Sequence, residues 1–169
     1  MVRSVVEWGR KTGYFFRRDR TLRIFIGGVM QGSKNGKGIH DQGYRQAICR
    51  MVKARHPDAA VVDPLALFPD SVEYADDRAR QVLFDMAEEA ARADVVVAYL
   101  SEASMGTALE MVRAYDAGIP VVSISSMTYN WFVRFLSRRV FPTLEAFADW
   151  VAEGGLQAIA SAKEAKGGN

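Results

Sequence analysis

The apolar run DVVVAYL at positions 94–100 is the feature that most constrains the fold of this chain. Every residue after Asp94 is apolar, so neither side of a strand formed here suits contact with water. Strands of this kind occur in parallel sheets that helices cover on both faces. Segments 76–92 and 107–117 have helical patterns, and Gly118 suits the position just after a helix. We therefore expect a buried central strand with a helix before and after it.

The same alternation of strand and helix extends over most of the chain. Strands separated by helices of this length imply right-handed crossovers and a parallel sheet. The sequence therefore predicts an α/β fold, a Rossmann-like (flavodoxin-like) three-layer sandwich with a mostly parallel sheet of about five strands. The other strands are expected at 22–28, 60–64, 119–125 and, at an edge, 140–142; the other helices are expected at 39–55, from about Asn130, and after a capping Thr143.

Charge is distributed unevenly along the chain. The 169 residues suit one domain and have a formal net charge of +2. Residues 1–20 hold a net charge of +4, which leaves −2 on the remainder. We expect a basic N-terminal arm or helix at 1–20, a single domain at 21–162 and a flexible tail at 163–169. A basic arm can touch nucleic acid or membrane, but its interleaved aromatic residues favour packing on the domain, so we expect no nucleic-acid partner.

Cysteine and histidine are scarce in this sequence. Cys49 is the only cysteine, and His40 and His56 are the only histidines. They form no intrachain disulfide and no zinc-binding cluster, so we expect no metal. No segment approaches the ~20 apolar residues that cross a bilayer, and the first residues lack the apolar run of a signal peptide. We expect a cytoplasmic protein without a membrane-spanning segment.

The stretch SEASMGTALE at 101–110 leaves the central strand, turns at Gly106 and enters a helix. A helix N-terminus offers unpaired N–H groups that bind phosphate and favour an ionised carboxylate nearby. Glu110, expected in the first turn, is therefore a candidate catalytic residue. The alternative is a capping box, T-x-x-E, in which Glu110 only accepts the backbone N–H of Thr107.

The segments IFIGGVMQGS at 24–33 and ADVVVAYLSEASMGTALEMVRAYDAGIPVV at 93–122 resemble the nucleoside 2-deoxyribosyltransferase superfamily. That superfamily includes deoxyribosyltransferases, 2'-deoxynucleoside 5'-monophosphate N-glycosidases and CMP N-glycosidases. The shared pattern is a first strand with glycines, here Gly27 and Gly28, then an Ala-Asp-apolar strand and a G-T-x-x-E turn. The resemblance implies that Glu110, 16 residues after Asp94, is the nucleophile and that no cofactor is needed.

Two positions in the resemblance bear on the substrate. Members that act on free nucleosides carry an aspartate six residues before the glutamate, whereas monophosphate glycosidases carry serine, and this chain has Ser104. Phe25 stands where deoxyribose-specific members usually have tyrosine and CMP-type members have phenylalanine, which leaves room for ribose. The alternatives are a serine that only forms a turn and a phenylalanine that only fills the core.

The resemblance implies that the phosphate binds at the loop after the first strand, through Gln31, Gly32 and Ser33. Gly106 and Thr107, which begin the G-T-x-x-E turn, complete this binding site. Lys34 and Lys37 can add positive charge, although the arginine usual in the family is missing. The alternative for the glycines is a flexible turn.

Two further candidates complete the implied site. Family enzymes carry an aspartate eight residues before the one that opens the central strand; Met86 occupies that position, and Asp85 lies about 100° away around a helix. Either a local bulge brings Asp85 into the site, or Asp85 is a solvated charge.

Family sites are often completed by a neighbouring subunit, and Asn130 is a candidate for that role, with a helix N-cap as the alternative.

The sequence thus predicts an N-glycosidase that acts on a nucleoside 5'-monophosphate by a retaining double displacement through Glu110. Two alternatives stay open: a nucleobase (deoxy)ribosyltransferase acting on nucleosides, and a nucleotide-binding sensor without turnover. The aromatic cluster in SSMTYNWFVRFL at 125–136 favours a homodimer or a higher homo-oligomer, unless the N-terminal arm covers it.

Overall fold

A computed structural model describes residues 21–164, so the predicted arm and residues 165–169 of the predicted tail lie outside the described residues. All neighbouring strands of the five-stranded sheet pair in parallel, in the order β2-β1-β3-β4-β5. This is the order of flavodoxin-like doubly wound sheets, and it confirms the predicted fold class, including a last strand at the edge. The strands are β1 (Arg23–Gly28), β2 (Ala60–Val62), β3 (Val95–Tyr99), β4 (Val121–Ile124) and β5 (Ser137–Phe141).

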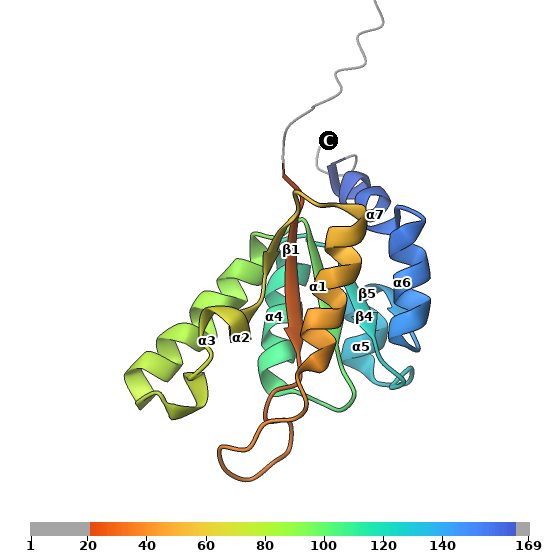
Figure 1. Ribbon diagram of the computed structural model, residues 1–169. Coiled ribbons are helices and arrows are strands. Elements are labelled where there is room, and N and C mark those ends of the chain that lie inside the picture. Colours follow the sequence, from red (N-terminus) through yellow and green to blue (C-terminus); the bar gives the residue numbers. More distant parts are fainter. Residues whose placement is uncertain (1–20, 165–169) are drawn as a thin grey trace, which may run out of the picture.

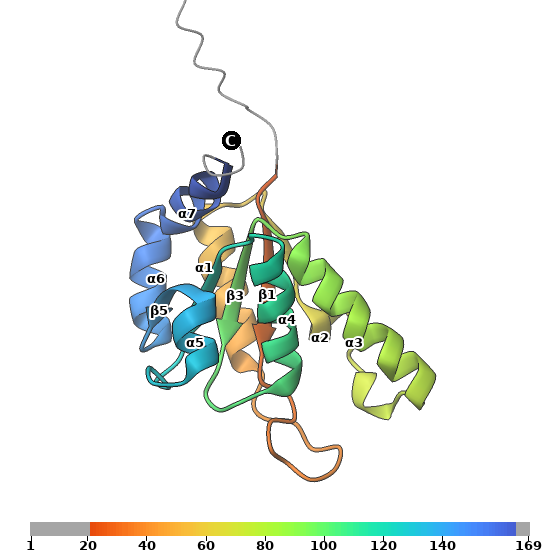
Figure 2. The same cartoon turned by 180° about the vertical axis from the view of Figure 1, so that it is seen from behind.

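Helices cover both faces of this sheet. Figure 1 shows α1 (Gly43–Arg55), α6 (Leu144–Ala152) and α7 (Gly155–Glu164) on one face. Figure 2 shows α3 (Asp76–Ala91), α4 (Met105–Asp116) and α5 (Trp131–Leu136) on the other. Side chains of β3 alternate between the two layers, because Val95 and Val97 join the α1 side and Val96 and Ala98 join the α4 side. All four are fully buried, which explains why this strand carries no polar residue.

Several predicted helix ends are confirmed. Gly118 follows α4 with a φ of 70°, a left-handed conformation that glycine adopts without strain. The hydroxyl of Thr143 accepts the N–H of Ala146 and caps α6. Asn130 caps α5, because its side-chain oxygen accepts the N–H groups of Phe132 and Val133. The predicted helix starts near Asn130 and after Thr143 are therefore correct.

The start of α4 differs from the prediction. The helix begins at Met105 instead of residue 107, and its N-cap is Ser104, whose hydroxyl accepts the N–H of Thr107. Thr107 is therefore no N-cap, and the capping box with Glu110 does not form. Glu110 lies in the second turn of α4, not in the first. The cause is that Ser104 is itself a good capping residue and takes the role three residues earlier.

The prediction also placed the start of one helix wrongly and missed the short helical segments after β2. Helix α1 begins at Gly43 rather than at residue 39, because the preceding residues are held by the loop after β1: the N–H of His40 is 2.7 Å from the Met30 carbonyl oxygen. A short helix α2 (Pro64–Leu67) and a single 3₁₀ turn η1 (Ser71–Glu73) follow β2 and were not predicted. Asp63 caps α2 by accepting the N–H of Leu65.

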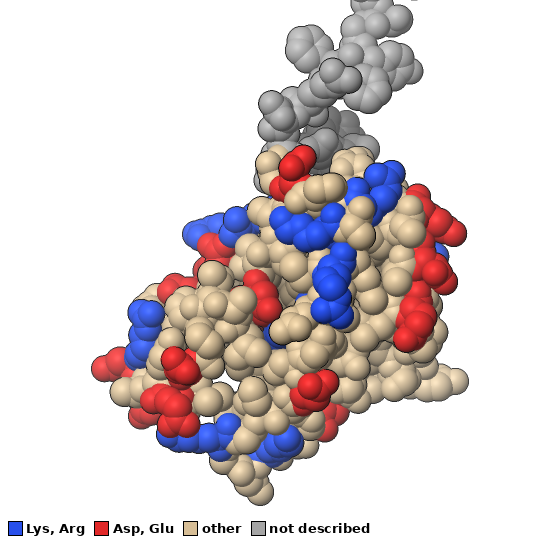
Figure 3. Space-filling model, in the orientation of Figure 1, with Lys and Arg blue, Asp and Glu red and all other residues tan. Residues whose placement is uncertain are grey.

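The predicted last helix is two helices. Gly154 has a φ of 87° and separates α6 from α7, which extends to Glu164, beyond the expected domain end at 162. No helix among residues 21–164 is both long and apolar enough to span a membrane. Figure 3 shows basic side chains gathered over α1 and a strip of acidic side chains along the edge of this face that α6 forms.

Candidate active site

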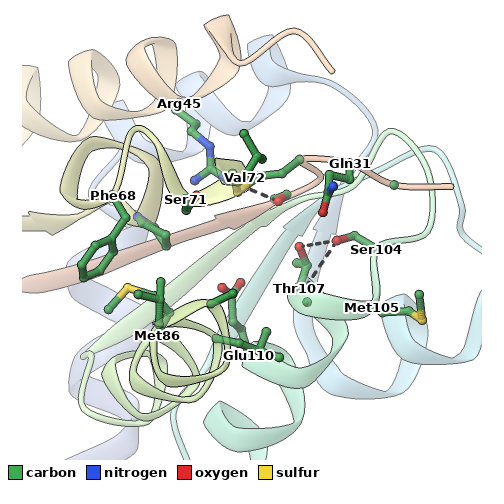
Figure 4. Close-up of a pocket in the computed structure, with 18 residues that line it drawn as sticks. Gln31, Arg45, Phe68, Ser71, Val72, Met86, Ser104, Met105, Thr107 and Glu110 are labelled. Atoms are coloured by element: carbon green, nitrogen blue, oxygen red, sulfur yellow. Dashed lines mark hydrogen bonds between the residues drawn. The ribbon is translucent and has the colours of Figure 1, made fainter. Parts of the chain in front are cut away.

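A cavity of about 330 Å³ lies at the carboxyl end of β1, between the segments that follow β2 and β3. Doubly wound sheets bind ligands at this place, where the strand order changes direction. The volume lies at the lower end of the range for small-molecule sites. Figure 4 shows Phe68 and Met86 toward one end of the cavity and Gln31, Ser104 and Thr107 toward the other. The cavity therefore has an apolar end and a polar end.

Glu110 lies between these two ends and reaches the cavity from α4. Its Oε2 atom is inaccessible to water and has no hydrogen-bond partner among the described residues. Burial raises the pKa of Glu110 to about 8, and the nearby positive charge of Arg45 offsets part of this rise. Loss of hydration therefore outweighs the charges that favour the ionised form of this carboxylate.

Gly27 makes room for this carboxylate. A Cβ atom at position 27 would lie 2.7 Å from Oε2 of Glu110, 3.4 Å from Cγ2 of Thr107 and 3.7 Å from Cε1 of Phe25. The structure thus brings four of the predicted residues together at the end of β1. Phe25 is completely buried in the core on this side of the sheet and is not part of the cavity wall.

Arg45 faces Glu110 across the cavity, as Figure 4 shows. It projects from α1, only 3% of it is exposed, and its guanidinium reaches around the end of β1. The Nη1 atom is 2.9 Å from Oδ1 of Asp63 and 3.0 Å from the Ile26 carbonyl oxygen. The Nη2 atom donates to the Gly28 carbonyl oxygen at 3.2 Å, and Nε donates to Oε1 of Gln42 at 2.8 Å. These contacts fix the charge in one position.

The polar end of the cavity is the N-terminus of α4. The Ser104 hydroxyl oxygen accepts hydrogen bonds from the N–H and the hydroxyl of Thr107, at 3.4 and 3.1 Å, so its own proton is free to be donated. A Cβ atom at Gly106 would meet nothing within 4 Å, so the first turn is open toward the cavity. Open N–H groups with a hydroxyl donor at a helix N-terminus suit an anionic group such as a phosphate.

The apolar end is formed by α3 and by the unpredicted segment between β2 and α3. Its side chains come from Phe68, Val72, Ala79, Val82, Leu83 and Met86, with Ser71 as a polar neighbour. Flat, largely apolar walls of this kind suit an aromatic ring, which loses little hydration on entry.

The loop after β1 forms the rim of the cavity. Gln31 and Gly32 line it, whereas Ser33 does not. The carboxylate of Glu102 accepts the N–H of Ser33 at 3.2 Å and lies 2.9 Å from Nε2 of His40, which ties the loop to the segment after β3. Lys34 donates to the Ile39 carbonyl oxygen, and Lys37 pairs with Glu73. Neither lysine lines the cavity, so the expected extra charge there is absent among the described lining residues.

Two predicted catalytic residues lie outside the cavity. Asp85 is exposed on α3 and accepts a hydrogen bond from Gln81 at 2.7 Å. No bulge in α3 redirects it, because the helix runs unbroken from Asp76 to Ala91 and presents Met86 to the cavity instead. Asn130 is exposed and lines a second hollow of about 420 Å³ under α5, together with Ser33. The structure therefore does not bring Asp85 or Asn130 to Glu110 within one subunit.

Arg45 and the segment 64–75 were missed by the sequence analysis. The sequence did hold a signal for Arg45, because it falls at the core-facing spacing of Ile48 and Val52 on the same helix. A charged residue at such a position needs partners and is a candidate for a functional site. Its partner Asp63 lies 18 residues away in the sequence, so the pairing itself was not predictable from local pattern.

This chain is similar to known proteins in its structure. No protein-family model and no curated protein matches its sequence. The structure is similar to a 2-deoxyribosyltransferase from the psychrotolerant bacterium Bacillus psychrosaccharolyticus, with a TM-score of 0.56 and 16% identity over 75% of this chain and 90% of that chain. It is also similar to a conserved protein from Enterococcus faecalis V583, with a TM-score of 0.59 and 17% identity over 80% and 99% of the two chains.

The first of these similarities shows that the chain shares its fold with a 2-deoxyribosyltransferase, as the resemblance in the sequence implied. A third similarity, with a TM-score of 0.47 and 13% identity over 78% of this chain and 98% of that chain, is to the CMP N-glycosidase BcmB of Clostridium botulinum.

Within residues 21–164 no group of three or more histidine, cysteine or acidic side chains is arranged to hold a metal ion.

Proposed function

We propose that this protein is an N-glycosidase that hydrolyses the base–sugar bond of a nucleoside 5'-monophosphate, with Glu110 as the nucleophile. The observation that carries the proposal is the carboxylate of Glu110. Glu110 is half-buried, the Oε2 atom of its carboxylate is inaccessible to water and has no hydrogen-bond partner among the described residues, and the carboxylate lies between an apolar end and a helix N-terminus. A nucleotide has the same order of parts, with a flat base, a sugar carbon and a phosphate.

The two ends of the cavity orient the substrate. The base fits between Phe68 and Met86, and the phosphate fits at the N-terminus of α4, where Ser104 and the N–H groups of the first turn donate hydrogen bonds. This orientation puts the anomeric carbon C1' beside Glu110. Serine at position 104 supports a phosphate at this end, since a carboxylate there would repel it.

The chemistry has two displacements. An oxygen of ionised Glu110 attacks C1', the bond from C1' to the base nitrogen breaks, and a glycosyl ester forms on the enzyme. Water then attacks C1' and releases the sugar phosphate, so the configuration at C1' is retained overall. The fold that the chain shares with a 2-deoxyribosyltransferase supports glycosyl transfer in general, and Ser104 favours a nucleotide substrate over a free nucleoside.

A mass-spectrometric screen tests the proposal. The protein is incubated with ribo- and deoxyribonucleoside 5'-monophosphates and with the matching nucleosides, and free base is measured. We expect base release from a monophosphate, loss of several orders of magnitude in Glu110→Gln, and no change in the control Glu153→Gln, which alters an exposed glutamate beyond α6. Binding of an intact nucleotide without base release would identify a sensor instead. Exchange of one base for another in place of hydrolysis would identify a transferase.

A further inference from the structure

The cavity contains two ionisable side chains among its described lining residues, Glu110 and Arg45. The others are apolar side chains, glycines, Gln31, Ser71, Ser104 and Thr107. When Glu110 attacks C1', the electrons of the broken bond move onto the base. No carboxyl other than that of Glu110 lines the cavity in the described part of the chain, so no second acid is in place to protonate the departing base.

Arg45 has one donor left for a ligand. A guanidinium group has five N–H donors. Four are used by Gln42, the Ile26 carbonyl, Asp63 and the Gly28 carbonyl, which leaves one N–H on Nη2. Because Arg45 lines the cavity, this last N–H is the donor that remains available to a ligand there.

We infer that Arg45 is a catalytic residue of the proposed reaction, which stabilises the departing base as an anion. The inference rests on the proposed function. As the bond from C1' to the base nitrogen breaks, the electron pair stays on the base, and the N–H of Arg45 donates a hydrogen bond to the charge that develops there. The base anion takes its proton from water after it leaves. Arg45 holds the proton throughout, because a guanidinium stays protonated in proteins.

This role sets the class of base. A base leaves readily as an anion when ring carbonyl groups spread the negative charge, as in the oxo bases uracil and hypoxanthine. Amino bases such as cytosine and adenine spread the charge less well and need protonation instead. The cavity therefore selects nucleotides of oxo bases, through the rate of bond cleavage rather than through binding.

The native protein allows the first test. Initial rates of base release are compared for the 5'-monophosphates of inosine, uridine, adenosine and cytidine, in ribo and deoxy forms. We expect kcat to be highest for the two oxo bases. An equal kcat for adenosine and inosine monophosphates would overturn the inference while leaving the proposed function intact. Absence of base release from every nucleotide would instead contradict the proposed function.

The second test removes the donor and changes the charge of the leaving group. Arg45→Gln is assayed on inosine 5'-monophosphate and on its N7-methylated form, whose base is already cationic and leaves as a neutral molecule. We expect kcat to fall about 10²–10³-fold for the unmethylated nucleotide, with little change in kcat for the methylated one. Equal losses on both substrates would show a purely structural role for Arg45.

Asp63→Asn is the matched control, because it weakens the same buried contact but leaves the free N–H of Arg45 in the cavity. We expect both variants to lower the melting temperature, and only Arg45→Gln to change the ratio of the two kcat values. The same change of ratio in Asp63→Asn would contradict a direct role. If Arg45→Gln does not fold, Arg45→Met, which also removes the donor and the charge but keeps an unbranched side chain, replaces it in the comparison.

Discussion

Glu110 and Gly27 are in such close contact that a Cβ atom at position 27 would lie 2.7 Å from the carboxylate oxygen Oε2. The next residue, Gly28, is constrained by a different neighbour, because a Cβ atom there would lie 2.3 Å from the hydroxyl oxygen of Tyr44. Successive residues of a strand point to opposite faces of the sheet. One glycine therefore makes room for the proposed nucleophile, and the other makes room for the helix layer behind it.

We expect Gly27→Ala and Gly28→Ala to have separate effects. Gly27→Ala displaces the end of a flexible side chain, so turnover should fall at least about tenfold while the free energy of unfolding changes by less than about 1 kcal/mol. Gly28→Ala meets the ring of Tyr44, which is stacked on Tyr99 at 4.2 Å between ring centroids, so it should destabilise the fold by about 1–3 kcal/mol. Kinetics and chemical denaturation of both variants check this. Loss of stability without loss of turnover in Gly27→Ala would contradict the placement of Glu110.

The rate of base release should depend on pH. Burial raises the pKa of Glu110 to about 8, and only the ionised carboxylate attacks C1'. We expect kcat/KM to rise about tenfold per pH unit below pH 8 and to level off above it. A profile that is flat between pH 6 and pH 8 would exclude Glu110 as the group that must ionise.

The same raised pKa makes Glu110 a source of instability at high pH. Its pKa is about 8 in the folded protein and 4.5 in the unfolded chain, so the unfolded chain loses its proton first as the pH rises. Stability is therefore lost progressively between pH 4.5 and pH 8. We expect Glu110→Gln to be more stable than the native protein at pH 8, by on the order of a few kcal/mol, and the difference to vanish near pH 4. Urea denaturation at the two pH values measures it.

Ser104→Asp should weaken binding of the phosphate group while leaving binding of the rest of the substrate unchanged. A carboxylate at the N-terminus of α4 repels an anionic ligand but leaves the apolar end unchanged. We expect affinity for a nucleoside 5'-monophosphate to fall at least about tenfold more than affinity for the nucleoside, measured by calorimetry. Equal losses for both ligands would show that the phosphate does not bind beside Ser104.

The aromatic surface of α5 should hold two subunits together. Tyr129, Trp131, Phe132 and Phe135 are 89%, 75%, 48% and 60% exposed, which is a large apolar area for a monomer. We expect the native protein to be at least a dimer by light scattering at micromolar concentration, and Trp131→Glu to have a lower mass in the same measurement.

Mixing Glu110→Gln with Asn130→Ala subunits should restore part of the activity if Asn130 completes the partner's site. A native monomer would exclude this arrangement.

The sequence predicted β1 to β4 well because each is a mostly apolar run ended by glycine, proline or a polar residue. The edge strand β5 was predicted only at 140–142, because its first three residues, from Ser137 to Arg139, are polar. Burial on both faces leaves only one interpretation of a segment such as DVVVAYL. Helix starts were less predictable, because several capping residues compete: Ser104 caps α4 although Thr107 has a suitable spacing. Helix α1 starts late because contacts from the loop after β1 hold the residues before it.

The candidate site was predictable only where its residues are close in sequence. Ser104, Thr107 and Glu110 belong to one short segment, 104–110, and were found together. Arg45 was missed, because its role depends on Asp63 and on the carbonyl groups of β1, which the fold alone brings together. Asp85 was a candidate only if a local bulge redirected it. Helix α3 has no bulge, so Met86 faces the cavity and Asp85 is exposed, in agreement with the alternative of a solvated charge.

The path of the Arg45 side chain has a consequence for how function relates to folding. The residue originates in the helix layer on one side of the sheet and ends beside a carboxylate supplied by the other layer, after passing the carbonyl groups of β1. Neither layer alone assembles the pair. Any partly folded species that keeps only one layer is therefore inert, and during denaturation the loss of catalysis and the loss of tertiary structure should follow the same cooperative transition.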